Sequence, residues 1–417
     1  MTLYRLFLSL AFPALAALAV LRVLRGREDR AALAARLGLA PASPDRRPTI
    51  WLHAASNGEL ASIRPFLDRL RADRPDLRLL VTTNSVTGRD LALSWGLAAQ
   101  CAPFDLRSAA LRLIRGWDIR AHWIVESELW PNRLAACAGA GVPVAVLGAR
   151  LSARTARGWA RMPGLARPML DAIGYVSAQD EDSAARLRGL GLDPSRLGPE
   201  LDLKALYEPP ATPRPGPDLA AAYPRATTWL AASTHEGEEE AVIAAHLEAR
   251  KARPGLRLIL APRHPSRAEA VAALLARAGL DFDRRSRAEA RGAEVLLADT
   301  LGEMALWYRL AGTVLVGGSL VAKGGHTPYE PAAFGCALLH GPHLDNFGPA
   351  YGRLAEAGAA REVSDADSLA EALAELADPT ARAALAARAQ AALARPDASE
   401  AVLAALLQRL PAPEDSC

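Results

Sequence analysis

The chain has 417 residues, of which 51% are hydrophobic, so it is long enough for two or three domains with sizeable cores. Its formal net charge is +3, and this near balance argues against a nucleic-acid-binding protein, whose basic residues are more numerous and clustered. The four cysteines show no CxxC spacing and no associated histidine pair. They predict a reducing compartment and no structural zinc site.

The N-terminal segment is apolar. Residues 6–21 carry no charge, and Arg22, Arg25, Arg27 and Arg30 follow them. A helix of this length rises roughly 24 Å, less than the ~30 Å hydrocarbon core, so it would span marginally or lie partly inserted. We interpret residues 1–30 as an inner-membrane anchor, with a cleaved signal peptide or a plain hydrophobic helix as alternatives. The positive-inside rule then places the rest of the chain on the cytoplasmic side.

After this segment, short strand-like runs alternate with amphipathic helical stretches. The first half has predicted strands at 49–55, 77–83, 119–125, 142–147 and 175–178, with helices that include 59–71 and 181–190. Prolines cluster at 209–217 and predict a stiff linker. The alternation restarts with predicted strands at 227–232, 256–261, 294–298, 313–316 and 337–339. Residues 379–410 form a predicted helical segment on the second half, whose end could cross back to the first.

This alternation is typical of a parallel, doubly wound sheet, so the sequence predicts an α/β fold with two Rossmann-like domains facing a cleft. The predicted boundaries are an anchor at 1–30, an N-terminal domain at 31–207, a proline-rich linker at 208–226, and a C-terminal domain with C-terminal helices at 227–417.

Three acids follow strands of the first half. Glu59 stands where a helix begins, and the partial positive charge there would keep it ionised at neutral pH, which makes it a candidate general base. Complementing the helix dipole is the alternative, and the local pattern alone favours it. Glu126 and Glu128 follow the strand 119–125, and residues two apart on an extended strand point the same way. We expect one raised pKa if these two carboxylates are close, while capping of nearby loops is the alternative.

An arginine row follows Ser152, a predicted helix cap. Arg154, Arg157 and Arg161 have helical spacing, and Arg150 lies just before them. Such a row can bind phosphates bidentately, as a phosphorylated lipid would require. A solvated helix face is the alternative in a chain this rich in arginine.

In the second half, residues 314–331 run from a buried strand into glycines and then into a helix that carries Glu330. Open α/β sheets make nucleotide sites in this way. Glycines let the backbone approach a phosphate, N–H groups at the helix start can bind its oxygens, and Glu330 could accept hydrogen bonds from ribose hydroxyls. A tight turn without a ligand is the alternative. Lys323 lies in this turn and is one of three lysines in the chain.

Two more strand ends carry polar groups. Ser233 and Thr234 end one predicted strand, where hydroxyls and amides could hold an anion, and Arg263 and His264 end the next. With residues 317–330 they would place three strand ends around one crevice. The chain has no P-loop sequence, no Gly-x-Ser-x-Gly and no His-Glu-x-x-His, which argues against a P-loop phosphotransferase, an α/β-hydrolase and a metal site.

Taken in order, these motifs resemble the 3-deoxy-D-manno-octulosonic acid (Kdo) transferases, membrane-anchored glycosyltransferases of lipopolysaccharide biosynthesis that act in lipid A core assembly. The matching stretches cover nearly the whole chain in the family's order, and they are residues 53–59, 82–88, 126–132, 149–158, 232–238, 262–265, 316–331 and 341–347.

The resemblance implies a GT-B fold and an inverting transfer of Kdo from CMP-Kdo to the 6′-hydroxyl of a lipid A precursor, a tetraacyl, bisphosphorylated glucosamine disaccharide. The N-terminal domain would bind this acceptor and the C-terminal domain the donor. Glu59 falls on the family's general base. The departing CMP is an anion that amides and cations can stabilise, so the resemblance implies neither a metal nor another cofactor. It also implies contact with inner-membrane lipids.

The resemblance also implies site residues. The implied donor-binding residues are Ser233, Thr234, Arg263, His264, Gly318, Ser319, Gly324, Gly325, His326, Glu330 and Asn346. The implied acceptor-binding residues are Ser56, Asn57, Gly58, Glu126, Glu128, Arg150, Arg154 and Arg157.

The sequence departs from the family pattern at a few positions without removing an implied catalytic group. Asn57 replaces an apolar residue, Gly148 replaces a common Asn, and residues 198–200 lack the usual Gly-Asn pair. Thr327 replaces a frequent Asn and Tyr329 a frequent Leu at the donor pocket. Two alternatives stay open: a GT-B transferase that uses a UDP-sugar, and a membrane-tethered module that binds nucleotide or lipid without turnover.

Overall fold

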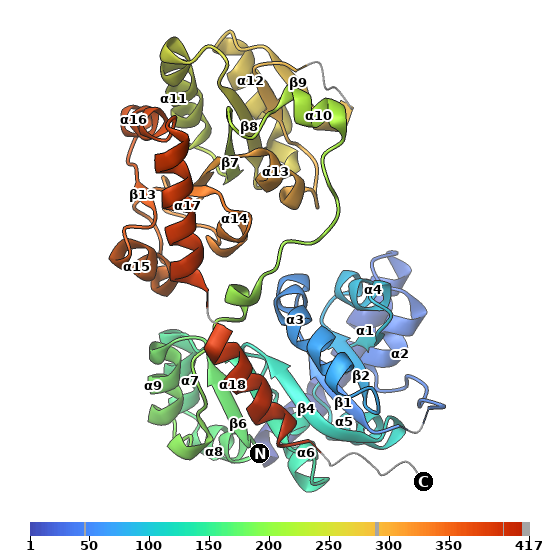
Figure 1. The fold of residues 1–417 in the computed structure, drawn as a ribbon. Coiled ribbons are helices and arrows are strands. Elements are labelled where there is room, and N and C mark those ends of the chain that lie inside the picture. Colours follow the sequence, from blue (N-terminus) through green and yellow to red (C-terminus); the bar gives the residue numbers. More distant parts are fainter. Residues whose placement is uncertain (46, 288–291, 395, 411–417) are drawn as a thin grey trace. The chain divides into compact units, whose positions relative to one another are not determined.

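The computed structural model describes residues 1–45, 47–287, 292–394 and 396–410. The chain divides into two compact units (Figure 1). Unit 1 is Met1–Leu206 together with the C-terminal segment from residue 395, and unit 2 is Tyr207–Ala394. Each unit is built on a parallel sheet, as the alternation of strands and helices predicts.

Unit 1 has a six-stranded sheet in the order β3-β2-β1-β4-β5-β6. Its strands are β1 (Thr49–His53), β2 (Arg78–Thr83), β3 (Ala98–Cys101), β4 (Ile119–Val125), β5 (Val144–Ala149) and β6 (Tyr175–Ala178). Its helices are α1 (Thr2–Leu24), α2 (Arg30–Arg36), α3 (Asn57–Asp73), α4 (Val86–Ser94), α5 (Arg107–Gly116), α6 (Pro131–Gly139), α7 (Ala153–Ala160), α8 (Pro163–Asp171), α9 (Glu181–Gly189) and α18 (Pro396–Leu407), with short 3₁₀ turns at Pro194–Arg196 and Leu203–Leu206.

Both faces of this sheet are covered because its strands are apolar on both sides. Side chains alternate along a strand, so Leu52 faces the core that includes α3 and α18, whereas Trp51 faces the core that includes α5, α6 and α8. On the first face Leu60 and Ile63 of α3 are fully buried. On the second face Leu134 of α6 is fully buried.

The C-terminal helices differ from the prediction. Residues 379–410 form two helices, α17 (Pro379–Leu393) and α18, because Ala394 adopts an extended conformation ahead of Pro396, which cannot donate a backbone hydrogen bond. Figure 1 shows α18 on unit 1, where Val402 and Leu406 are fully buried in the core with α3. The predicted second domain at 227–417 therefore ends earlier, near residue 394, and residues 411–417, including Cys417, lie outside the described residues.

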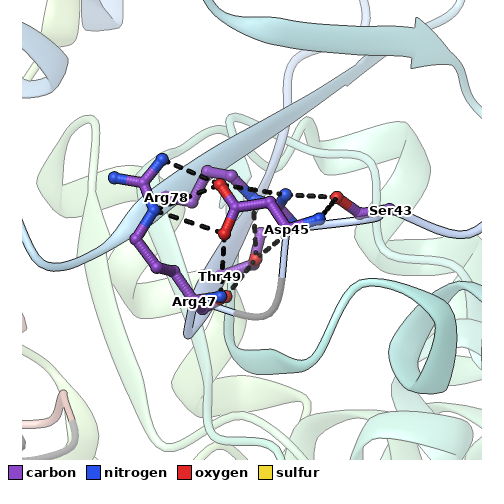
Figure 2. A network of polar contacts seen from close by, with 5 residues as sticks. All are labelled: Ser43, Asp45, Arg47, Thr49 and Arg78. Carbon is purple, nitrogen blue, oxygen red and sulfur yellow. Dashed lines mark hydrogen bonds and ion pairs between the residues drawn. The ribbon is translucent and has the colours of Figure 1, made fainter.

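The order of strands in unit 1 reverses between β1 and β4, which lie side by side. Ligands of open α/β sheets bind at the carboxyl ends of the strands at such a switch point. The opposite, amino ends of β1 and β2 carry a network of Ser43, Asp45, Arg47, Thr49 and Arg78 (Figure 2). Arg47 pairs with Asp45 at 2.8 Å, and Arg78 donates to Thr49 at 3.0 Å. This network joins the segment before β1 to β2. Both of its arginines therefore have polar partners at this end of the sheet, Asp45 for Arg47 and Thr49 for Arg78.

Unit 2 has a seven-stranded parallel sheet in the order β13-β12-β11-β7-β8-β10-β9. Its strands are β7 (Thr228–Thr234), β8 (Arg257–Pro262), β9 (Phe282–Arg284), β10 (Val295–Leu297), β11 (Thr313–Val316), β12 (Ala337–His340) and β13 (Arg361–Glu362). Its helices are α10 (Pro217–Ala222), α11 (Glu239–Ala252), α12 (Ala268–Arg277), α13 (Met304–Leu310), α14 (Tyr329–Ala333), α15 (Gly348–Glu356), α16 (Ala366–Glu375) and α17, with 3₁₀ turns at Pro265–Arg267 and Arg285–Arg287.

One large core of unit 2 packs α11, α12, α16 and α17 against the sheet. The predicted linker 208–226 is partly folded onto this unit. It contains α10, and the fully buried Tyr223 donates from its hydroxyl to the carbonyl of Ala293 at 3.2 Å. Apolar burial of Leu219 and Tyr223 thus makes the second half of the linker part of unit 2. In this sheet the order reverses between β7 and β11.

Candidate active site

Glu59 lies at the switch point of unit 1, in the first turn of α3 directly after β1. Ser56 caps the helix, because its hydroxyl accepts the N–H of Glu59 at 3.2 Å. The Glu59 carboxylate accepts the N–H of Ala55 at 2.7 Å and the hydroxyl of Ser56 at 3.2 Å. These two bonds hold the carboxylate at the carboxyl end of β1.

The protonation of Glu59 differs from the prediction that the helix start would keep it ionised. Its pKa is raised to about 7: burial raises it most and the nearby charge of Glu126 also raises it, while the hydrogen bond from Ala55 lowers it. Desolvation therefore outweighs the helix N-terminus. About half of the Glu59 side chains carry a proton near neutral pH, which is where a general base works most effectively.

Glu126 and Glu128 lie beyond β4, the neighbour of β1 at the switch point. Glu126 is 3.6 Å from Nζ of Lys204, and Glu128 accepts the indole N–H of Trp130 at 2.5 Å. Both carboxylates influence the pKa of Glu59, so the structure brings the three acids together, as predicted.

The expectation of one raised pKa does not hold for Glu128. Glu126 has a φ of 58°, so the chain leaves the extended conformation there and the two side chains find different partners. The side chains of His53 and Trp130 lower the pKa of Glu128 to about 2. The raised pKa belongs to Glu59 instead, because Glu59 lacks a cationic partner among the described residues.

His53 connects the acids to the core of unit 1. Trp51 donates to the Thr82 hydroxyl at 2.8 Å, and that hydroxyl lies 2.9 Å from Nδ1 of His53. The Thr82 hydroxyl also lies 3.4 Å from the carbonyl oxygen of Leu52, and Nε2 of His53 lies 3.7 Å from Glu128. Burial lowers the pKa of His53 to about 4, so this imidazole is neutral at pH 7.

The other predicted acceptor residues surround these acids or lie on α7. Ser56, Asn57 and Gly58 form the exposed start of α3, and Asn57 accepts the hydroxyl of Thr87 at 3.4 Å. The arginine row and Arg150 just before it are exposed, and within the described part of the chain these side chains form no ion pair. The members of the row are Arg154, Arg157 and Arg161. The row therefore offers charged groups to solvent or to an anionic ligand.

In unit 2 the switch point carries a cluster of imidazoles and cations. His235 follows β7 and stacks on His326 with ring centroids 5.1 Å apart, and their Nε2 atoms lie 2.9 Å apart. His264, after β8, packs edge-on against His235 at 6.2 Å. Arg263 and Lys323 add positive charge to this cluster.

The histidine pair is neutral. Burial lowers the pKa of His235, and it lowers that of His326 to about 4. One ring therefore donates and the other accepts between the two Nε2 atoms. The structure thus brings together the predicted residues Arg263, His264 and His326.

The amides of the glycine loop after β11 have an acceptor within unit 2. The carboxylate of Glu238 accepts the N–H groups of Gly318 at 2.7 Å, Ser319 at 3.1 Å and Leu320 at 2.9 Å. The N–H groups at the start of the following helix, α14, were expected to bind a phosphate, and that expectation stays a prediction. Gly317 has a packing role, since a Cβ there would lie 2.6 Å from the carbonyl oxygen of Ser233.

Other predicted donor residues support the same loop. The hydroxyl of Ser319 donates to the carbonyl of Val316 and accepts the N–H of Gly341 at 2.8 Å. Asn346 donates from its side chain to the carbonyl of Lys323 at 2.9 Å. Side chains at Gly324 and Gly325 would collide with Asn346 and with the carbonyl of His343, respectively. Ser319 and Asn346 therefore use their polar groups inside the loop.

Glu330 and the end of β7 complete the site in unit 2. Burial raises the pKa of Glu330, and no described residue donates a hydrogen bond to its carboxylate. Arg263 influences this pKa as well. Thr234 is buried and donates to Glu239 at 3.3 Å, whereas Ser233 is half-buried with a φ of 58°. A polar residue in this conformation at a strand end is common at ligand sites.

The site residues that the sequence analysis missed are His53, Lys204, His235 and Glu238. Lys204 could have been noticed, since a lysine is rare in this chain and arginine is the usual cation. His53, His235 and Glu238 lie inside the stretches singled out at strand ends, but only the fold shows which neighbours they contact.

Comparisons with known proteins agree with this architecture. A family profile described as 3-Deoxy-D-manno-octulosonic-acid transferase (kdotransferase) matches residues 31–206. The 3-deoxy-D-manno-octulosonic acid transferase of Bordetella pertussis is 35% identical over 373 residues, which are 85% of this chain and 86% of that protein. The protein of the same name from Haemophilus influenzae is 34% identical over 332 residues, 78% of each chain.

A solved glycosyltransferase from Rickettsia africae shares the fold, with a TM-score of 0.60 and 12% identity over 87% of this chain and 98% of that one. The succession of two Rossmann-like units is that of GT-B glycosyltransferases. With sequence identity above 30% over most of two relatives, the chain belongs to the 3-deoxy-D-manno-octulosonic acid (Kdo) transferase family.

Proposed function

We propose that this protein transfers Kdo from CMP-Kdo to a hydroxyl of the lipid A precursor, with inversion at the anomeric carbon. Family membership supports the reaction class. The observation that carries the proposal is the Glu59 carboxylate, oriented by the N–H of Ala55 and with a pKa of about 7. A carboxylate of ordinary pKa is a weaker base toward an alcohol than one whose pKa is raised to the working pH.

In the proposed reaction Glu59 takes the proton of the acceptor hydroxyl while the oxygen of that hydroxyl attacks the anomeric carbon of Kdo. The new C–O bond forms as the bond from that carbon to the phosphate of CMP breaks, and CMP leaves with the electron pair. Glu126 and Glu128 keep Glu59 basic, because their negative charges disfavour a third ionised carboxylate nearby. Lys204 limits this effect by pairing with Glu126.

Unit 2 would bind the donor. Arg263 and Lys323 supply positive charge for the phosphate and for the carboxylate of Kdo, and His264 and the neutral His235–His326 pair supply hydrogen bonds. Glu330 fits the ribose of CMP, because it is a carboxylate without an internal donor, and the two hydroxyls of a ribose would supply that donor.

Unit 1 would bind the acceptor. Arg150, Arg154 and Arg157 are exposed and unpaired among the described side chains, so they can bind the phosphate groups of a bisphosphorylated disaccharide. The alternative for this row is a solvated helix face. The two interpretations differ in whether the arginines bind the phosphate groups of the lipid.

We also propose that α1 holds the protein at the inner membrane without crossing it. By length and composition α1 is apolar enough to span a bilayer. Its first turn is tied to unit 1, however, since Tyr4 donates to Asp105 at 2.9 Å and Arg5 donates to Asn132 at 3.2 Å. Its other end leads into α2, whose Ala32 and Ala35 are buried in unit 1. A helix fixed at both ends lies along the protein, with its free apolar side chains available to the lipid surface.

The donor can be tested by isothermal titration of the purified protein with CMP and with UDP. We expect CMP to bind more tightly. A preference for UDP would favour the alternative of a UDP-sugar transferase. Incubation with CMP-Kdo labelled in the sugar separates the proposed enzyme from a binding module, because only a Kdo transferase moves this label into the lipid.

A further inference from the structure

Glu238 is a buried carboxylate that the proposed reaction does not use. Its side chain is fully buried at the junction of β7 and α11. It accepts four backbone N–H groups: those of Gly318, Ser319 and Leu320, and that of His235 at 2.8 Å. Successive N–H groups that converge in a loop form a concave anion site. In this protein the carboxylate of Glu238, rather than a bound ion, accepts these hydrogen bonds.

The same local plan occurs in unit 1. Glu59 follows a glycine after the first strand of its sheet and accepts the N–H of Ala55, four residues earlier, at 2.7 Å. Glu238 also follows a glycine after the first strand of its sheet and accepts the N–H of His235. The two carboxylates differ in their remaining partners. Among the described residues, Glu59 accepts one more hydrogen bond, from Ser56, whereas Glu238 accepts three further N–H groups. Each oxygen of the Glu238 carboxylate therefore holds two backbone donors.

The loop that Glu238 binds carries the rest of the site in unit 2. The carbonyl of Gly317 accepts the N–H of His326 at 3.1 Å, and the carbonyl of Ser319 accepts the N–H of His343 at 3.0 Å. Glu238 also holds His235, the stacking partner of His326. One carboxylate thus joins the loop after β7 to the loop after β11 at the switch point of the sheet.

We propose that Glu238 is a positioning residue of the donor site: its carboxylate takes the place of a bound anion in the glycine loop and fixes His235 and His326 where they face the donor. This inference rests on the proposed function. It follows that the donor phosphate is bound by side chains of this cluster, since the loop amides already have an acceptor. Without the carboxylate, three loop N–H groups lose their partner, and buried donors without an acceptor destabilise the loop.

The test uses the full-length protein with Glu238→Ala, with Glu238→Gln, and with Glu240→Ala as the control on the exposed side of the same helix. Isothermal titration measures CMP affinity, with and without added formate or formamide. We expect Glu238→Ala to bind CMP at least about tenfold more weakly, and formate to recover most of this loss. Formamide, which has the same size but no charge, should recover none of it. Glu240→Ala should match the wild type.

Glu238→Gln keeps the volume of the side chain and tests the idea even if the alanine variant does not fold. Its amide would point an N–H toward the loop donors, so we expect weaker CMP binding that formate does not rescue, with unchanged binding of the lipid acceptor to unit 1. If the wild type binds CMP and Glu238→Gln binds it equally well, or if formate and formamide rescue Glu238→Ala alike, the positioning role is wrong. If the wild type itself binds no CMP, the proposed function fails as well.

Discussion

At the scale of single residues, Glu59 shows how burial can set up a base. Its carboxylate has a helix N-terminus and a backbone N–H to stabilise its charge, yet removal from water and the charges of Glu126 and Glu128 raise its pKa to about 7. The raised pKa increases the affinity of the carboxylate for a proton and so its strength as a base. It also makes the reaction sensitive to pH within the physiological range.

The pH dependence of kcat tests this value. Glu59 must be ionised to accept the proton of the acceptor, and its pKa is raised, so ionisation is lost as the pH falls through about 7. We expect kcat to be nearly constant above pH 8 and to fall about tenfold per unit of pH well below pH 7. Initial rates at saturating donor and acceptor between pH 5 and pH 9 measure the midpoint.

Lys204→Met provides a matched variant for this profile. Removing the cation leaves the charge of Glu126 uncompensated, which disfavours ionisation of Glu59, so the midpoint should move to higher pH. A midpoint near 4.5 in the wild type, or a Lys204→Met midpoint that moves to lower pH, would contradict the assignment of Glu59 as the titrating base.

The sequence predicts the positions of the three acids, but it does not predict the pKa of Glu59. The placement of Glu59, Glu126 and Glu128 follows from parallel strands that end at one edge. The raised pKa of Glu59 depends on desolvation and on the charge of Glu126, which is far away in the chain. The sequence did not indicate the acceptor of the glycine-loop amides for the same reason, because Glu238 comes from a different strand end.

At the scale of elements, α1 carries most of the exposed apolar side chains of unit 1. Leu10 and Phe7 are 74% and 67% exposed, and a run of such residues on one helix favours a lipid surface. Residue patterns predicted the helix and its apolar character. The contacts of Tyr4 and Arg5, which distinguish lying along the protein from spanning, come only from the structure.

Membrane binding of α1 can be measured by sedimentation with vesicles that contain phosphatidylglycerol. We expect Phe7→Glu with Leu10→Glu to weaken binding by about tenfold or more, since two apolar side chains no longer enter the lipid and two charges resist entry. Leu301→Glu, at an equally exposed leucine of unit 2, is the control and should bind as the wild type does. Equal binding of the double variant and the control would refute a role for α1 as the anchor.

Short edge strands were the elements that the sequence did not predict. β3, β9 and β13 have four, three and two residues, and β3 is only partly buried. Their sequences lack the apolar runs of the central strands because an edge strand has fewer neighbours to pack against. The central strands β4 and β11 match their predicted bounds, and so does the edge strand β6, because all three are apolar and bounded by turn residues.

At the scale of the whole molecule, two sheets of the same plan carry complementary groups at their switch points. Unit 1 has a carboxyl group of raised pKa within an acidic cluster, and unit 2 has cations, neutral imidazoles and the acid Glu330, whose pKa is also raised. The alternation of strands and helices predicts this division. The sequence allowed the end of the C-terminal helical segment to cross back to the first half, and α18 does so: its Val402 and Leu406 complete the core of unit 1 after the chain has passed through unit 2. The sequence pattern of an alanine-rich helix does not indicate which unit the helix packs against.

The central claim is that Glu59 deprotonates a lipid hydroxyl that attacks Kdo. The most direct measurement incubates the full chain with CMP-Kdo and the tetraacyl disaccharide bisphosphate and weighs the lipid by mass spectrometry. The matched control is Asp68→Asn, which changes an exposed acid on the same helix. We predict that the wild type and Asp68→Asn increase the lipid mass by whole Kdo residues. Glu59→Gln should bind CMP normally and transfer Kdo about 10²–10⁴-fold more slowly. An unchanged lipid mass with the wild type, or transfer by Glu59→Gln at the wild-type rate, would contradict the claim.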